Sequence, residues 1–180
     1  MRYRLFFLLI ICAFLPIRAI AVPGELHSSS AMEIQAAFLV KFSAYVKWPE
    51  SAFSSPGDPI IIGIVGRDPF GSTVDKIARS FKAKGRNVEI RRFTNSADIT
   101  KSHVLFIPSS QQGNINKVQA ALAGNPVLLV GNSPGFLEQS GSINFVMVGK
   151  KIRFDISRTN CQKAGLTISS KLLAVAHGIK

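Results

Sequence analysis

A helical period of apolar residues runs through residues 30–47, where nonpolar side chains recur every three or four positions. Ser30 and Glu33 at its start match a capping box, in which the serine caps the first turn and the glutamate bonds back to it. Trp48-Pro49 closes the pattern, because proline cannot continue a helix. The sequence therefore predicts a helix capped by Ser30 and preceded by a flexible lead-in at residues 22–30.

Short apolar runs typical of buried strands alternate with helical runs over the rest of the chain. The predicted strands cover residues 60–65, 87–93, 103–107, 126–130, 143–148 and 151–156, and the predicted helices cover residues 72–84, 114–124 and 158–176. The last two strands form a hairpin across Gly149-Lys150, placed at one edge of the sheet or as a lip. This order predicts an α/β fold: a single-domain sandwich, mostly parallel sheet with helices on both faces and a C-terminal antiparallel hairpin.

The first 21 residues have the composition of an export signal. Two arginines open the chain, an apolar core covers residues 5–17, and Ala19-Ile20-Ala21 matches a cleavage site. The apolar core is shorter than the roughly 20 residues that span a bilayer, although an uncleaved anchor stays as an alternative. We expect a signal peptide at 1–21, cut after Ala21, and an exported, periplasmic domain at 31–180.

The net charge of the chain limits the types of partner that it is expected to bind. The chain has a formal net charge of +12, which falls to +9 when the three arginines of the signal peptide are removed. Because an exported protein meets no genomic DNA, we expect no nucleic acid partner. Anionic lipid heads, cell-wall polymers or an acidic protein face are the alternatives, beside dispersed lysines that only keep the chain soluble.

Cysteine and histidine positions exclude the commonest cofactor chemistry. Cys12 lies in the signal peptide, so Cys161 alone remains and no internal disulfide can form; we expect its thiol to be buried. His27, His103 and His177 are far apart and lack ligand spacing. We therefore predict no metal and no cofactor.

One motif resembles the nucleophile elbow of serine hydrolases. Gly131, Ser133 and Gly135 form G-x-S-x-G after an apolar run, and Asp155 and His177 follow in hydrolase order. The residue after the serine is a proline, which lacks the N–H that an oxyanion hole takes from this position. We predict no enzyme activity, and we expect Ser133 to cap a turn that places Phe136 in the core.

A second motif resembles a phosphate-binding loop. Residues 66–73 begin G-x-x-x-x-G, but the lysine that neutralises phosphate charge is replaced by Ser72. Two interpretations stay open for this strand-to-helix junction: an anion site beside Arg67, and a plain turn in which Phe70 packs inward.

Ligands of open α/β sheets bind beyond the carboxyl ends of the parallel strands. The residues after the predicted strand ends carry arginine, hydroxyl and amide groups and only one acid. We call this set the strand-end rim, and its members are Arg67, Asp68, Phe70, Arg91, Arg92, Ser109 and Asn132. The rim is predicted to bind a partner or a small anionic ligand, not to catalyse a reaction.

Several sequence blocks together resemble the YfiR-like family. These are "AAFLVKFSAYVKWP", "IVGRDPFG", "SHVLFIPSS", "SPGF" with "INFV", and "KIRFDISRTNCQKAGLTISSKLLAVA", within residues 31–176. The resemblance implies a periplasmic, non-enzymatic α/β protein. It further implies a negative regulator that binds the periplasmic sensor region of an inner-membrane diguanylate cyclase, lowers cyclic-di-GMP and so affects biofilm formation.

The resemblance also suggests partners and one difference. An outer-membrane lipoprotein that withdraws the regulator and a homodimer are further candidate partners. The family often has a cysteine where this chain has Ser102, so the resemblance does not extend to redox control by an internal disulfide. The alternative to cyclase inhibition is a periplasmic receptor that senses a small anionic ligand and relays its occupancy to a membrane sensor.

Overall fold

One eight-stranded sheet organises the computed structural model, which describes residues 23–122 and 124–180. Its strand order is β10-β8-β7-β6-β5-β2-β4-β3. The strands are β2 (Ile60–Val65), β3 (Lys82–Ala83), β4 (Arg86–Phe93), β5 (Val104–Ile107), β6 (Leu128–Gly131), β7 (Ile143–Val148), β8 (Lys151–Ile156) and β10 (Gly178–Ile179). The β7–β8 and β3–β4 pairs are antiparallel and the other neighbours are parallel, so the predicted mostly parallel sheet is confirmed.

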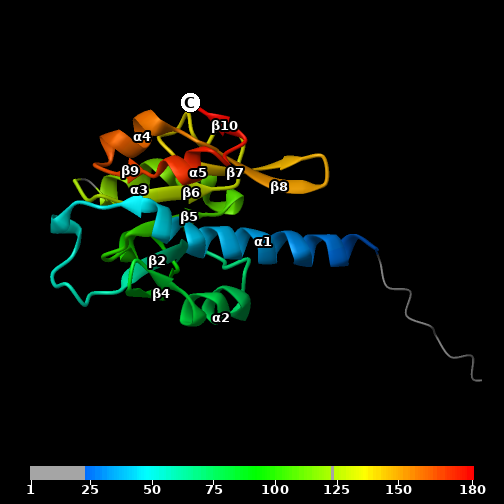
Figure 1. Cartoon of the computed structure of the whole chain (residues 1–180). Helices are drawn as coiled ribbons and strands as arrows, with labels where there is room; N and C mark the ends of the chain where they lie inside the picture. The colour runs from blue at the N-terminus through cyan, green and yellow to red at the C-terminus, as the bar shows by residue number, and fades with distance from the viewer. Residues whose placement is uncertain (1–22, 123) are drawn as a thin grey trace, which may run out of the picture.

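Helices cover both faces of this sheet (Figure 1). They are α1 (Pro23–Tyr45), α2 (Ser72–Ser80), α3 (Ile115–Ala121), α4 (Arg158–Lys163) and α5 (Ser170–Leu173), with 3-10 turns η1 (Glu50–Ala52), η2 (Ser96–Asp98) and η3 (Ser109–Asn114). Ile62 and Ile64 of β2 face a core formed with α1, α2, α4 and α5. Val65 and Leu105 face a second core that contains α3 and Phe136. The predicted sandwich is therefore correct.

An aromatic cluster joins α1 to the C-terminal hairpin. The ring of Phe42 on α1 lies 5.0 Å from that of Phe154 on β8 and 5.7 Å from that of Phe145 on β7, between centroids. Phe38, one turn earlier, lies 5.3 Å from Phe154 and 6.1 Å from Phe42. Each aromatic pair contributes about 0.5–1.5 kcal/mol beyond the burial of its area. This cluster fixes the position of α1 over β7 and β8.

The start of α1 differs from the prediction. The helix begins at Pro23, so Ser30 lies within it and does not cap it, and the expected lead-in is helical from Pro23. The predicted signal peptide lies outside the described residues. Among those residues, no helix is long and apolar enough to cross a membrane.

Two other predicted helices are shorter in the structure. The run at 72–84 ends at Ser80, because Lys84 and Gly85 both have positive φ and form the turn between β3 and β4. The run at 158–176 divides into α4 and α5 around Gly165, whose φ is 70°. Between these helices, β9 (Thr167–Ile168) pairs with β1 (Val46–Lys47) in a small antiparallel sheet.

The hairpin formed by β7 and β8 is confirmed, and of its two predicted positions, an edge of the sheet or a lip, the structure agrees with the lip. The short strand β10, not β8, is the edge strand, because it pairs in parallel with β8 at Asp155 and Ile156. β6 pairs with β7 only at Ile143 and Asn144. The outer half of the hairpin therefore extends beyond the sheet, in the same direction as the first half of α1 (Figure 1).

His103 holds the 48–53 segment against the sheet. Its Nδ1 accepts a hydrogen bond from the Ile61 N–H at 3.0 Å, and its Nε2 donates to the Ala52 carbonyl at 3.1 Å. The ring stacks on Phe53 at 4.6 Å, and Trp48 Nε1 donates to the His103 carbonyl. These partners require a neutral ring with its proton on Nε2. Burial lowers the pKa of His103 from 6.5, because the charged form is poorly solvated.

This histidine predicts an acid-sensitive stability. The unfolded chain, where the imidazole has its ordinary pKa, takes up a proton before the folded chain does as the pH falls. The contribution of His103 to the free energy of unfolding should therefore reach its maximum above about pH 6.5 and decrease below it. Urea unfolding at about pH 7.5 and pH 5.5 measures the effect.

The matched variant is His103→Asn, whose amide oxygen can replace Nδ1 as the acceptor but cannot titrate. It should remove the decrease in this pH range. An equal decrease in the variant would show that His103 is not responsible.

Candidate functional site

The structure brings the four predicted strand ends to one edge of the sheet. β4, β2, β5 and β6 are neighbours in this order and all run parallel. Their last residues, Phe93, Val65, Ile107 and Gly131, therefore lie side by side. This arrangement agrees with the sequence analysis, while the binding role of the rim stays a prediction.

Arg92 is held at this edge by two carboxylates. Its Nε donates to Asp68 Oδ2 at 2.8 Å, and its two terminal nitrogens donate to the carboxylate of Asp75 at 2.6 and 3.1 Å. The hydrogen bonds to Arg92 lower the pKa of Asp75, and those to Asp75 and Asp68 raise the pKa of Arg92. An anion would have to compete with two carboxylates for this guanidinium. Arg92 thus fastens the loop after β2 to β4.

The other rim residues do not form one surface. Arg91 and Arg92 are consecutive in β4, so their side chains point to opposite faces of the sheet, and Arg91 pairs with Glu89 at 3.7 Å. Phe70 is only 5% exposed and packs on Phe106 at 4.9 Å. Phe70 is therefore not available at the strand-end rim, where it was predicted to take part in binding, and the alternative interpretation, a turn in which Phe70 packs inward, is confirmed.

The amide and hydroxyl positions of the rim are linked through the backbone. The Ser109 N–H donates to Asn132 Oδ1 at 2.8 Å, which connects the end of β5 to the end of β6. Arg67 is exposed. The rim thus contains Arg67 as an exposed cation, and the Ser109 N–H and Asn132 Oδ1 are already bonded to each other.

The G-x-S-x-G motif has a packing role in the structure. A Cβ on Gly131 would lie 2.5 Å from the ring of Phe136, and a Cβ on Gly141 would lie 2.1 Å from it. Phe136 itself is fully buried, as expected. The two glycines therefore leave space for this ring between the end of β6 and the start of β7.

Ser133 does not cap a turn. Its hydroxyl is buried and has no hydrogen-bond partner, so the capping prediction is wrong. His177 Nδ1 pairs with Asp155 Oδ1 at 3.0 Å. Asn144, which is opposite Asp155 in the hairpin, lies against Ser133 and donates to its carbonyl at 3.0 Å. The histidine is thus not placed between the serine and the aspartate, as a catalytic triad requires.

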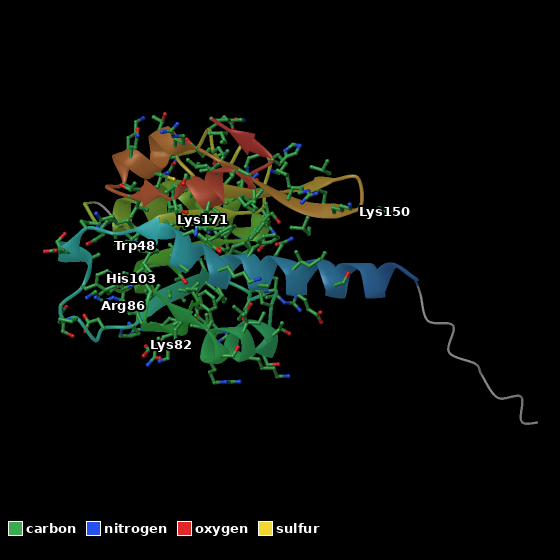
Figure 2. All side chains as sticks on the ribbon, in the orientation of Figure 1. Trp48, Lys82, Arg86, His103, Lys150 and Lys171 are labelled. Carbon is green, nitrogen blue, oxygen red and sulfur yellow. The ribbon has the colours of Figure 1, made fainter. Side chains whose placement is uncertain are left out.

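The outer half of the β7–β8 hairpin carries exposed apolar and basic side chains. Met147 is 59% exposed and Val148 is 40% exposed, and Lys150 projects from the turn (Figure 2). Met147 and Val148 are consecutive in β7 and therefore lie on opposite faces of the hairpin, Met147 beside Ile152 and Val148 beside Lys151. We call the set Met147, Val148, Lys150 and Lys151, which includes both faces of the hairpin, the tip surface. Sequence analysis missed it because "INFVMV" has the composition of a buried strand; the Gly149-Lys150-Lys151 turn was the only signal.

Metal-binding geometry is not found in the part of the chain that the structure describes. No group of three or more histidine, cysteine, aspartate or glutamate side chains gathers there. Cys161 is buried, as expected, and burial raises the pKa of its thiol to about 11.

A match to a family model shows which family the chain belongs to. The model described as YfiR/HmsC-like matches residues 32–177, which is most of the chain. The chain belongs to the YfiR/HmsC-like family. Members of this family are periplasmic, non-catalytic regulators that act through protein–protein interactions with membrane signalling proteins, in the context of diguanylate cyclase signalling.

Solved structures show the same type of fold at low sequence identity. A conserved domain protein from Vibrio cholerae O1 biovar El Tor is 16% identical with a TM-score of 0.53, over 83% of this chain and 60% of that one. An ABC domain from Streptococcus pneumoniae, solved in complex with L-Trp, is 13% identical with a TM-score of 0.55, over 81% and 60%. The YfiR/HmsC-like chain thus spans about 60% of each. The comparison with curated proteins gives no match.

The packing role of Gly131 leads to a stability prediction. Gly131→Ala should lower the free energy of unfolding by about 1–3 kcal/mol, because the new methyl group overlaps the Phe136 ring. Gly57→Ala is the control, since a methyl group at Gly57 would have no atom within 4 Å and the φ of this glycine is not positive; its effect should stay within about 0.5 kcal/mol.

The pair Gly131→Ala with Phe136→Leu tests the cause. The smaller side chain should make the double variant more stable than the sum of the two single effects. Additive effects would contradict the overlap as the reason for the glycine. Chemical unfolding of the four proteins provides the free energies.

Proposed function

We propose that this protein docks in the periplasm on the sensor region of an inner-membrane signalling protein and holds a diguanylate cyclase inactive, which lowers cyclic-di-GMP and restrains biofilm formation. The observation that carries the proposal is the family match over residues 32–177. The signal-like residues 1–21 support export to the periplasm. An outer-membrane lipoprotein that removes the regulator from the sensor would complete the switch.

The tip surface is the docking surface in this proposal. Met147 and Val148 offer apolar area beyond the part of β7 that pairs with β6, and Lys150 and Lys151 place two positive charges next to them. An apolar centre with a charged border is the usual composition of a transient protein interface. The matching face of the sensor should therefore be apolar with acidic residues around it.

Inhibition follows if docking distinguishes two states of the sensor. A regulator shifts an equilibrium only by the difference between its affinities for the two conformations, and each tenfold difference corresponds to about 1.4 kcal/mol. The aromatic contacts of Phe42 with Phe145 and Phe154 hold α1 and the hairpin in a fixed relation. A rigid surface of this kind loses little conformational entropy on binding, so its selectivity for one sensor state is retained.

The receptor alternative for a small anion gains no support from the rim. Arg92, near the end of β4, already pairs with Asp68 and Asp75. The docking proposal does not need a free cation at this edge.

The docking proposal can be tested in a strain in which the gene for this protein is deleted and the wild-type protein or a variant is expressed in its place. Loss of the protein should raise cyclic-di-GMP, and the wild-type protein should lower it again. A variant with Met147→Glu and Val148→Glu should fail to lower it, because docking would bury two carboxylates against an apolar face bordered by acidic residues, which should weaken docking by about tenfold or more. Mass spectrometry of cell extracts measures cyclic-di-GMP.

The matched control is Val175→Glu, because Val175 lies outside the hairpin and is 60% exposed, similar to Met147; this variant should restore low cyclic-di-GMP. Unchanged cyclic-di-GMP in the deletion strain would contradict the cyclase proposal. Full activity of the hairpin variant with loss of activity in Val175→Glu would leave the function standing and place the docking surface elsewhere.

A further inference from the structure

A cavity of about 310 Å³ lies between α1, the loop after β6 and the hairpin. Its walls come from three parts of the chain: Gln35 of α1, the 132–134 loop, and residues 144–147 of β7 with Ile152 of β8. Small-molecule sites have volumes of about 300–1,000 Å³, so this cavity is at the lower end of that range.

Three buried oxygen atoms without hydrogen-bond partners belong to residues that line this one cavity. They are Gln35 Oε1, Ser133 Oγ and Asn144 Oδ1, and their residues are 7%, 1% and 8% exposed. Leaving a buried polar group unpaired costs about 1–3 kcal/mol, so native proteins rarely do so. No other buried side-chain oxygen or nitrogen in the described residues is unpaired. Their concentration at one cavity indicates that a partner is missing there.

The sequence places polar residues where the fold would favour apolar ones. Gln35 lies one turn before Phe38 on the inward face of α1, and Asn144 lies inside a buried strand. Asparagine is disfavoured in strands, and Asn144 uses only its Nδ2 within the fold, on the Ser133 carbonyl, so its Oδ1 stays unpaired. A local sequence rule broken at the cost of an unpaired polar atom is typical of a functional site.

The hydrogen-bonding capacity of these three oxygens limits the kind of ligand that the cavity can bind. Two are amide oxygens, which only accept hydrogen bonds, and the third is a hydroxyl, which can also donate. Three further polar atoms of the wall residues are already used: Asn132 Oδ1 accepts from the Ser109 N–H, the Pro134 carbonyl accepts from Gln112, and Asn144 Nδ2 donates to the Ser133 carbonyl. A carboxylate would be repelled by the amide oxygens, whereas O–H or N–H donors would satisfy them. No lining residue is charged, so a charge on the ligand would have no partner.

The remaining wall is apolar. Phe145, Val146, Met147 and Ile152 line the side formed by the hairpin. We propose that the cavity binds a small uncharged molecule with hydroxyl or amide donors on one side and a nonpolar face on the other, the chemistry of a neutral pyranose sugar. Because the three oxygens are hidden from water, the Gln35 side chain, with its three rotatable bonds, has to turn to admit the ligand.

The test uses the purified full-length chain and sugars that differ in charge. Isothermal titration calorimetry and thermal unfolding are measured with glucose and N-acetylglucosamine as neutral probes, glucuronate as the anion and glucosamine as the cation. A neutral probe should bind saturably and raise the melting temperature, and glucuronate and glucosamine should bind more weakly.

Two serine variants distinguish a binding role from a structural one. Ser133→Ala should leave the melting temperature of the free protein unchanged or higher, because it removes an unpaired hydroxyl, and should weaken sugar binding by about five- to tenfold. Ser142→Ala is the matched control: this buried hydroxyl accepts from the Leu129 N–H outside the cavity. It should lower the melting temperature and leave sugar affinity unchanged.

Gln35→Met, which keeps the length of the side chain and removes its polar atoms, should weaken sugar binding in the same way as Ser133→Ala. The absence of saturable binding of both neutral probes would overturn the proposal. Equal sugar affinity in the wild type and Ser133→Ala, or tighter binding of glucuronate or glucosamine, would also overturn it.

Discussion

The contact of Phe42 with Phe145 and Phe154 is the interaction on which the functional parts of this structure depend. It joins the N-terminal helix to a hairpin about a hundred residues later in the chain, where β6 no longer pairs with β7. Without α1, the outer half of the hairpin would be a two-stranded ribbon, and such ribbons are marginally stable in water. The same contact places Gln35 against the cavity. The docking surface and the cavity thus share one aromatic support.

The loop after β6 shows how a catalytic motif can arise from packing alone. Phe136 fills the second core, and its ring requires the absence of a side chain at Gly131 and Gly141. The loop then turns through Gly135, whose φ is 71°. Two of the three motif positions in G-x-S-x-G are therefore explained by one buried ring and one turn. Ser133, the third, faces the cavity wall instead of a histidine.

The sequence predicted the sheet well because its strands are continuous apolar runs, such as "IIIGIV" in β2, buried at every position. Local patterns were less reliable at the start of α1, since Ser30 and Glu33 fit a helix interior as well as a capping box. Phe70 and Arg92 were both assigned to the strand-end rim. The packing of Phe70 on Phe106 and the pairing of Arg92 with two carboxylates could not be predicted, because they depend on tertiary contacts. The tip surface and the unpaired oxygens of Gln35 and Asn144 likewise depend on where β6 ends, which the hydrophobic pattern does not contain.

A regulator of this family acts by binding a membrane signalling protein, so the central claim is that the tip surface makes this contact. The most direct measurement places a photo-activated cross-linking amino acid at Met147 and, as a control, at Val175, and identifies the proteins captured in living cells. The account predicts that position 147 captures the periplasmic region of an inner-membrane signalling protein and that position 175 does not. Capture of such a protein only from position 175, or no capture of an inner-membrane protein from position 147, would contradict it.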